Sequence, residues 1–156
     1  MSPTLDTTDV DLLRLLREDG RAAVTRLATQ LHLSRSAVHQ RLASLANRGV
    51  LTGFVPSVDP ERLGTGVAAF VLLSGGPGGR LEYGPLRDQL EALPHVELAS
   101  LVTGEADVLL LVRASDLEEL RRFLLEDLQQ VTQLRSTLTL LVLDEVIRRP
   151  FLLPGE

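Results

Sequence analysis

The residues with the clearest binding chemistry lie in the segment SRSAVHQR, which runs from Ser34 to Arg41. Arginine can donate paired hydrogen bonds to guanine, glutamine can pair with adenine, and hydroxyl groups donate to phosphate oxygens. The segment therefore offers the donors that a surface in the major groove of double-stranded DNA requires. The candidate DNA-binding residues in and near it are Arg21, Ser34, Arg35, Ser36, His39, Gln40 and Arg41.

A helix over residues 35–48 would position these side chains. Its apolar residues recur at i, i+4, i+7 and i+8 and form one buried face: Val38, Leu42, Leu45 and Ala46. The polar residues lie off that face, and the next acid along the chain is Asp59. An ordinary solvated face usually carries Glu and Lys, so the pattern favours DNA. Which side chains reach bases and which reach phosphates stays open.

A sharp corner before this helix joins it to a shorter one over residues 24–31. Ser34 can cap the second helix, and the corner residue, His32, would need a left-handed backbone conformation. Glycine adopts it most easily, but His is among the residues that tolerate it, at a cost of about 1 kcal/mol. Two helices with a tight turn and a polar second helix follow the helix-turn-helix plan, so we interpret His32 as structural.

The formal net charge of −5 is unevenly distributed. Residues 1–63 contain eight Arg against seven acids, whereas residues 64–156 contain eight Arg against fourteen acids. Residues 20–58 contain five Arg and no acid. Because salt screens charges beyond about 10 Å, a phosphate backbone would meet this local positive charge rather than the average. A basic helix face without a partner is the alternative.

Two further features complete the first domain, which we place at residues 1–64. A first helix begins near Asp6 or Thr7 and ends at Gly20, and the acids Asp9 and Asp11 compensate its dipole rather than bind a metal. After the helix-turn-helix, the segment VLTGFVPSV is typical of a β-hairpin, or wing, that turns at Gly53.

The second domain, residues 65–156, alternates strands and helices. We expect strands at 67–73, 95–103, 106–113 and 134–142, and helices at 82–93 and 115–128, the second capped by Ser115. The order βαββαβ is that of a ferredoxin-like antiparallel sheet. The predicted fold class is therefore α+β, with an N-terminal winged helix-turn-helix domain followed by a ferredoxin-like βαββαβ domain.

Several ordered motifs resemble the Lrp/AsnC (feast/famine) family of transcriptional regulators. LDTTDVDLLRLLREDGR and VHQRLASLANRGVLTGF resemble its DNA-binding half, and HVELASLVTGEADVLLLV and STLTLLVL resemble its ligand-binding half. The resemblance covers residues 5–146. It implies a sequence-specific DNA-binding regulator that forms homodimers through the ferredoxin-like domains, often assembled into tetramers or octamers. It also implies an amino acid or related small molecule as effector, bound between subunits.

The family's effector site falls, by this resemblance, on Thr103, Gly104, Asp107, Thr137 and Thr139. Gly104 would let a backbone approach closely, Asp107 could hold an ammonium group, and the two strand threonines share one face. A plain hairpin turn at TGEA, with threonines that only favour strands, is the alternative.

Four positions depart from the family pattern: His32 at the corner, Ala23 at the cap of the second helix, Ala106 before the loop aspartate and Gln133 before the last strand. A lost helix cap costs about 1 kcal/mol of stability. The changes at Ala106 and Gln133 weaken the expectation of a standard amino-acid effector.

The amino-acid composition excludes several other classes of protein. The chain has no cysteine, which excludes disulfides and thiolate metal sites and favours a reducing cytoplasm, and no apolar run approaches the roughly 18 residues of a membrane span. No catalytic or metal-binding spacing is present, so we expect no enzyme, cofactor or metal. Two alternatives stay open: an enzyme like the siroheme (tetrapyrrole) decarboxylases, for which His95 is the candidate residue, and an ACT-like amino-acid-sensing module without DNA binding.

Overall fold

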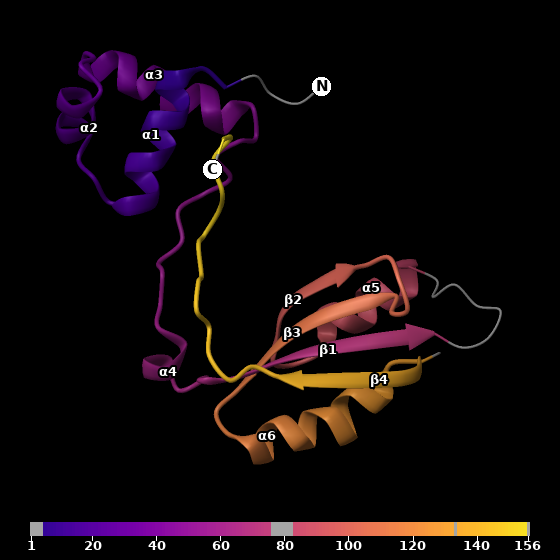
Figure 1. The fold of residues 1–156 in the computed structure, drawn as a ribbon. Coiled ribbons are helices and arrows are strands. Elements are labelled where there is room, and N and C mark those ends of the chain that lie inside the picture. The colour runs from indigo at the N-terminus through magenta and orange to yellow at the C-terminus, as the bar shows by residue number, and fades with distance from the viewer. Residues whose placement is uncertain (1–4, 76–82, 133, 156) are drawn as a thin grey trace. The chain divides into compact units, whose positions relative to one another are not determined.

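The computed structural model describes residues 5–75, 83–132 and 134–155, and the chain forms two compact units (Figure 1). The first unit contains Met1–Ser57 and Ile147–Glu156, and the second contains Val58–Val146. This division differs from the predicted one, in which the second domain ran from residue 65 to residue 156. The C-terminal segment belongs with the first unit because Leu153 is buried in that unit's core.

Three helices form the first unit: α1 (Thr7–Glu18), α2 (Val24–Gln30) and α3 (Arg35–Asn47). Asp6 caps α1 and Ser34 caps α3, each with a side-chain oxygen that accepts a backbone N–H, whereas Ala23 leaves α2 without a side-chain cap. The fully buried core residues are Leu12, Leu27, Val38 and Leu45. Ala46, which was predicted on the buried face of α3, is exposed, and the other helix predictions are confirmed to within one or two residues.

The corner between α2 and α3 has the predicted left-handed residue. His32 has a φ of 53°, and the amide of Leu33 donates to the carbonyl oxygen of Ala28 at 2.9 Å. That bond closes a tight turn between the two helices, so the helix-turn-helix is confirmed.

The predicted wing is wrong. Residues 51–59 contain no strand; they lead in an irregular path to the short helix α4 (Pro60–Leu63). The amides of Val50 and Leu51 both donate to the carbonyl oxygen of Leu45, so they close the end of α3 instead of joining a ladder. Pro56 has no amide hydrogen, so it could not donate to a hairpin ladder either.

The second unit has the predicted βαββαβ order. Its elements are β1 (Val67–Gly75), α5 (Tyr83–Ala92), β2 (Val96–Leu101), β3 (Val108–Ala114), α6 (Leu117–Arg122) and β4 (Leu134–Leu141). The helix of α6 continues through a π-helical segment η1 (Phe123–Asp127) and a 3₁₀ turn η2 (Leu128–Gln130). The strands form one antiparallel sheet in the order β2-β3-β1-β4. Residues 76–82, between β1 and α5, lie outside the described residues.

The residue that caps α6 differs from the predicted one. Asp116, rather than Ser115, accepts the amide of Glu119 at 2.8 Å, and Ser115 donates its own amide and hydroxyl to the Glu119 carboxylate at 2.6 and 2.7 Å. These two hydrogen bonds from Ser115 hold the pKa of Glu119 below its ordinary value.

Helices α5 and α6 cover the same face of the sheet (Figure 1). Val71 and Leu73 of β1 and Leu110 of β3 point into that core and are fully buried. Successive strand residues alternate between faces, so Phe70 and Leu72 lie on the opposite, open face. The register places further leucines beside them there: Leu98, Leu109, Leu111, Leu138 and Leu140. Among the described residues, no helix is long and apolar enough to cross a membrane.

Candidate nucleic-acid interface and effector site

The polar face of α3 lies at the surface of the first unit. Arg35, Ser36, His39 and Gln40 are exposed, whereas Val38 on the opposite side is fully buried. Ser34 accepts the amide of Ala37 at 3.1 Å, and its hydroxyl lies 2.9 Å from that of Ser36. The cap therefore keeps two hydroxyl groups at the N-terminal end of α3, where backbone amides also favour phosphate.

Two of the candidate arginines are available to a ligand. The side chains of Arg21 and Arg35 are exposed, and neither has an ion-pair partner within residues 5–75, 83–132 and 134–155. Exposed guanidinium groups of this kind can donate hydrogen bonds to phosphate or to guanine.

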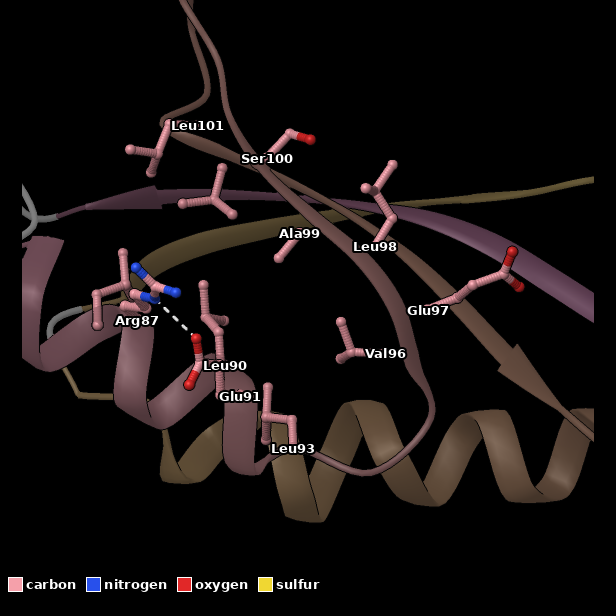
Figure 2. A pocket seen from close by; sticks show the side chains of 12 residues that line it. Arg87, Leu90, Glu91, Leu93, Val96, Glu97, Leu98, Ala99, Ser100 and Leu101 are labelled. Carbon is pink, nitrogen blue, oxygen red and sulfur yellow. Dashed lines mark hydrogen bonds and ion pairs between the residues drawn. The ribbon is translucent and has the colours of Figure 1, made fainter. Parts of the chain in front are cut away.

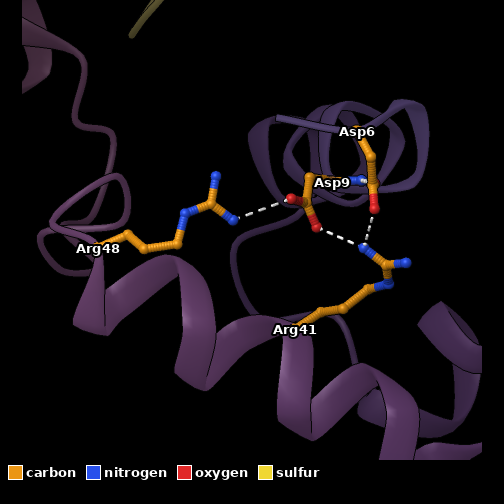
Figure 3. A network of polar contacts seen from close by, with 4 residues as sticks. All are labelled: Asp6, Asp9, Arg41 and Arg48. Atoms are coloured by element: carbon orange, nitrogen blue, oxygen red, sulfur yellow. Dashed lines mark hydrogen bonds and ion pairs between the residues drawn. The ribbon is translucent and has the colours of Figure 1, made fainter. Parts of the chain in front are cut away.

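Arg41 lies in different surroundings from Arg35. Its Nη1 donates to Oδ2 of Asp6 and to Oδ1 of Asp9, both at 2.7 Å, and Arg48 donates from Nη1 to Oδ2 of Asp9 at 3.2 Å (Figure 3). The Asp9 side chain is only 6% exposed. Hydrogen bonding from Arg41, and then from the Asp9 amide, holds the pKa of Asp6 below its ordinary value. Arg41 thus binds α1, a role that the sequence interpretation missed.

The positive charge of residues 20–58 is consequently smaller in the folded chain than in the sequence. Arg26 also pairs with an acid, donating to Asp19 at 3.0 Å. The acids that pair with Arg26, Arg41 and Arg48 all precede residue 20. Residues 20–58 therefore contain no acid in the sequence, but acids from outside the segment lie beside its arginines in the folded chain. These acids are 7 to 39 residues away from their arginines along the chain, so a count of the charges within one segment does not reveal the pairs.

In the candidate effector loop, Asp107 closes one end of the sheet. Its Oδ2 accepts the amide of Gly75 at 2.8 Å, and its own amide donates to the carbonyl oxygen of Leu73 at 2.9 Å. Its carbonyl oxygen accepts the amide of Val102 at 3.0 Å, and Gly104 has a φ of 127°. These contacts are those of a tight turn, and one carboxylate oxygen of Asp107 is already engaged by the backbone.

The two strand threonines lie on the other side of β1. Thr137 pairs with Leu73 and Thr139 pairs with Val71, so both are on the helix-covered face of the edge strand β4. Leu73 thus lies between Thr137 of β4 and Val108 of β3, and Asp107 directly precedes Val108. Thr103 is exposed at the tip of the loop. The structure brings Asp107 and Thr137 to the same end of the sheet, and Gln133 lies outside the described residues.

A groove that the sequence did not predict runs between α5 and β2 (Figure 2). Its volume is about 600 Å³, and its apolar lining includes Leu86, Leu90, Leu93, Val96, Ala99 and Leu101. An ion pair between Arg87 and Glu91, 2.7 Å from Nε to Oε1, lies at its edge. None of the five candidate effector residues lines it. Such a groove depends on the distance between a helix and a strand, which residue spacing does not reveal.

His95, the residue of the enzymatic alternative, is packed against α6 and η1. Its ring meets that of Phe123 edge-on with centroids 5.9 Å apart, and its Nε2 lies 3.9 Å from Oε1 of Glu119. Its φ of 66° makes it a second left-handed histidine. In the part of the chain that the structure describes, no group of three or more His, Cys, Asp or Glu could hold a metal ion.

Each of the two units is similar to a domain of known regulators. Residues 5–46 match the family model of the AsnC-type helix-turn-helix domain, and residues 68–152 match that of the Lrp/AsnC ligand binding domain. An HTH-type transcriptional regulator of Pyrococcus abyssi is 33% identical over 135 residues, covering 86% of this chain and 84% of the relative. The HTH-type transcriptional regulator LrpA of Mycobacterium tuberculosis is 34% identical over 142 residues, covering 91% and 93%.

Solved structures agree with this. E. coli AsnC superposes with a TM-score of 0.87 at 28% identity, covering 96% of this chain and 99% of that one. The transcriptional regulator NMB0573 of Neisseria meningitidis, solved as a complex with L-Met, has a TM-score of 0.88 at 27% identity and covers 96% of each chain.

Proposed function

The chain belongs to the Lrp/AsnC family of transcriptional regulators, and we propose that it recognises its DNA sites through the exposed face of α3. The observation that carries this proposal is that Arg35, His39 and Gln40 are exposed on a helix whose opposite side is buried. Arg35 and Gln40 have the donors for base edges, whereas Arg21, Ser34 and Ser36 suit phosphate. Arg41 contributes through its contact with α1.

Selection of bound sequences from random double-stranded DNA tests this proposal. We expect one recurring sequence with two half-sites, about one helical turn or a multiple of it apart, because a symmetric dimer presents two α3 helices. Affinity should fall steeply with salt, since arginine–phosphate contacts release counterions. Recovery of sequences without any common site would contradict recognition through α3.

We further propose that an amino acid or a related small molecule is the effector. The match to the family's ligand binding domain and the L-Met complex of the Neisseria relative support this. Two places in the second unit suit it. One is the sheet end with Thr103, Gly104, Asp107, Thr137 and Thr139, where Oδ1 of Asp107 accepts no hydrogen bond from the described residues and could meet an ammonium group. The other is the apolar groove between α5 and β2.

Calorimetry with each of the twenty amino acids separates these two sites. Asp107→Asn keeps an acceptor for the Gly75 amide but removes the charge, so it should abolish binding at the sheet end without opening the turn. Ala99→Leu fills the groove instead and should abolish binding only there. Absence of heat with every amino acid would refute the amino-acid proposal, whereas DNA selection would still test α3 independently.

The open face of the sheet supports a homodimer. Leu138 is 57% exposed and Leu140 is 50% exposed, beside Phe70 at 36%, which is an apolar surface that a second copy of the sheet would cover. Leu138→Glu should therefore yield monomers in sedimentation velocity. Leu125→Glu is the matched control, because Leu125 is equally exposed at 57% but lies in η1 on the helix side. Dimers in the Leu138 variant would exclude this face; tetramers or octamers would require a further surface.

A regulator of this kind acts where the chromosome is, so we place it in the cytoplasm and assign it no enzymatic role. The decarboxylase alternative needs a histidine directed at a tetrapyrrole, and His95 instead contacts Phe123. A tetrapyrrole absorbance band in the purified protein would revive that alternative. An ACT-like sensor without DNA binding would leave the exposed face of α3 without a partner.

A further inference from the structure

Asp9 joins the recognition helix to α1 at two points. Arg41 lies in α3, and Arg48, seven residues later, is the C-cap residue of that helix, so their side chains leave the same side about two turns apart, roughly 10 Å along the axis. Each binds a different oxygen of Asp9, Arg41 at Oδ1 and Arg48 at Oδ2 (Figure 3). A carboxylate held at two separate points of one helix restrains both the rotation and the sliding of that helix.

The burial of Asp9 makes this contact more than a surface ion pair. Its side chain is 6% exposed, while the side chains of Arg41 and Arg48 are 30% and 31% exposed. A buried charge is tolerated only when its partners are in place, so Asp9 keeps both arginines directed toward α1. Asp6 reinforces the arrangement by binding Arg41 through Oδ2 while its Oδ1 caps α1.

We propose that Asp9 is a positioning residue for DNA recognition: it orients α3 and withholds Arg41 and Arg48 from phosphate. The proposal rests on the proposed binding of DNA through α3. Arginines that are held less firmly can reach phosphate on any sequence, so loosening Arg41 and Arg48 strengthens non-specific binding. An α3 that is no longer held also presents its base-reading side chains less accurately, which weakens specific binding.

Two variants and a control test this role. Asp9→Asn removes the buried charge with little change of shape. Asp6→Asn removes a charge at the rim of the network and preserves the helix cap, because Asn caps as well as Asp. Asp11→Asn is the matched control: it lies on the same helix and frees one arginine, but that arginine is Arg14 of α1. Each is measured against the DNA sequence selected by the wild-type protein and against a random-sequence duplex, over a range of salt concentrations.

We expect Asp9→Asn to lower the ratio of specific to non-specific affinity by about tenfold. On the random duplex, its plot of log K against log salt should steepen by about one to two, since each additional phosphate contact adds about 0.9. Asp6→Asn should shift both quantities in the same direction by less, and Asp11→Asn should shift neither. A purely structural role would instead lower both affinities together with the melting temperature.

An unchanged ratio and an unchanged salt slope in both test variants would overturn the positioning role. If Asp9→Asn does not fold, Asp6→Asn decides the question, because its side chain is 55% exposed and its cap is retained. If the wild-type protein prefers no DNA sequence, the proposed function itself is refuted. If the wild type prefers one sequence and the variants prefer it equally strongly, only the positioning role of Asp9 is refuted.

Discussion

Arg35 and Arg41 lie six residues apart in one helix, yet their side chains meet different surroundings. Arg35 is exposed, whereas Arg41 binds two carboxylates of the α1 region. Residue type and spacing predicted both as DNA contacts. The distinction requires the position of α1, because the partners of Arg41 are 32 and 35 residues away in the chain.

Replacing Arg35 by Ala tests the base-reading face most directly. We expect specific DNA binding to weaken by about 1–3 kcal/mol if Arg35 reads a base. Fluorescence anisotropy with the selected duplex and with single-base variants of it measures this, and an equal loss on all duplexes would identify a phosphate contact. Arg62→Ala removes the same charge from the 89%-exposed side chain of a residue in α4 and should leave affinity unchanged. Wild-type affinity in the Arg35 variant would contradict the interface.

The two left-handed histidines should respond differently to glycine. His32 is exposed, so His32→Gly relieves backbone strain without loss of packing and should stabilise the first unit by up to about 1 kcal/mol. His95→Gly relieves similar strain but removes the ring contact with Phe123, so it should give no gain or a loss. Thermal denaturation of the two variants compares them, and destabilisation by His32→Gly would show that its side chain has a role beyond the corner.

At the scale of elements, periodicity and caps were sufficient wherever the hydrogen bonds are local. Helix α3 begins after Ser34 as predicted, because its cap and its apolar stripe lie within the helix itself. The prediction of a wing was wrong because a hairpin needs amides that donate to a partner strand. The amides of Val50 and Leu51 donate to the carbonyl oxygen of Leu45 instead. The π-helical segment η1 was not predicted either, since apolar spacing does not distinguish it from an α-helix.

Helix α2 offers a test at this scale. Ala23 has extended backbone angles at the cap position, φ −63° and ψ 140°, but no side chain that can accept an amide. Ala23→Ser should supply that acceptor and stabilise the first unit by about 1 kcal/mol in urea denaturation. Ser34→Ala, which removes the existing cap of α3, should destabilise it by a similar amount. Equal stability of both variants and the wild type would show that solvent already satisfies these amides.

For the molecule as a whole, the chain passes between its two units twice. After β4, Glu145 pairs with Arg113, which is 8% exposed in the second unit. The segment Ile147–Glu156 then belongs to the first unit, where Leu153 is 4% exposed and Arg17 lies over the ring of Phe151, 5.7 Å from its centroid. The helix-turn-helix core is thus completed by residues from the opposite end of the chain.

Leu153→Ala should therefore destabilise the first unit rather than the second. Truncating a buried leucine costs about 2–5 kcal/mol, and here the loss falls on the core around α1 and α3. Amide hydrogen exchange resolves the two units, and faster exchange should be confined to α1–α3. Leu152→Ala is the matched control, because the neighbouring side chain is 64% exposed. Unchanged protection in the Leu153 variant would remove the C-terminal segment from that core.

The sequence by itself determined the helix-turn-helix and the βαββαβ order, because those depend on periodicity, caps and turns within short stretches of chain, and its ordered motifs indicated the family by resemblance. Only the tertiary structure decided which arginines face solvent, that Asp107 closes the sheet, that a groove separates α5 from β2 and that Leu153 returns to the first core. Each of these depends on contacts between residues far apart in the chain, and a linear pattern does not specify which distant groups meet.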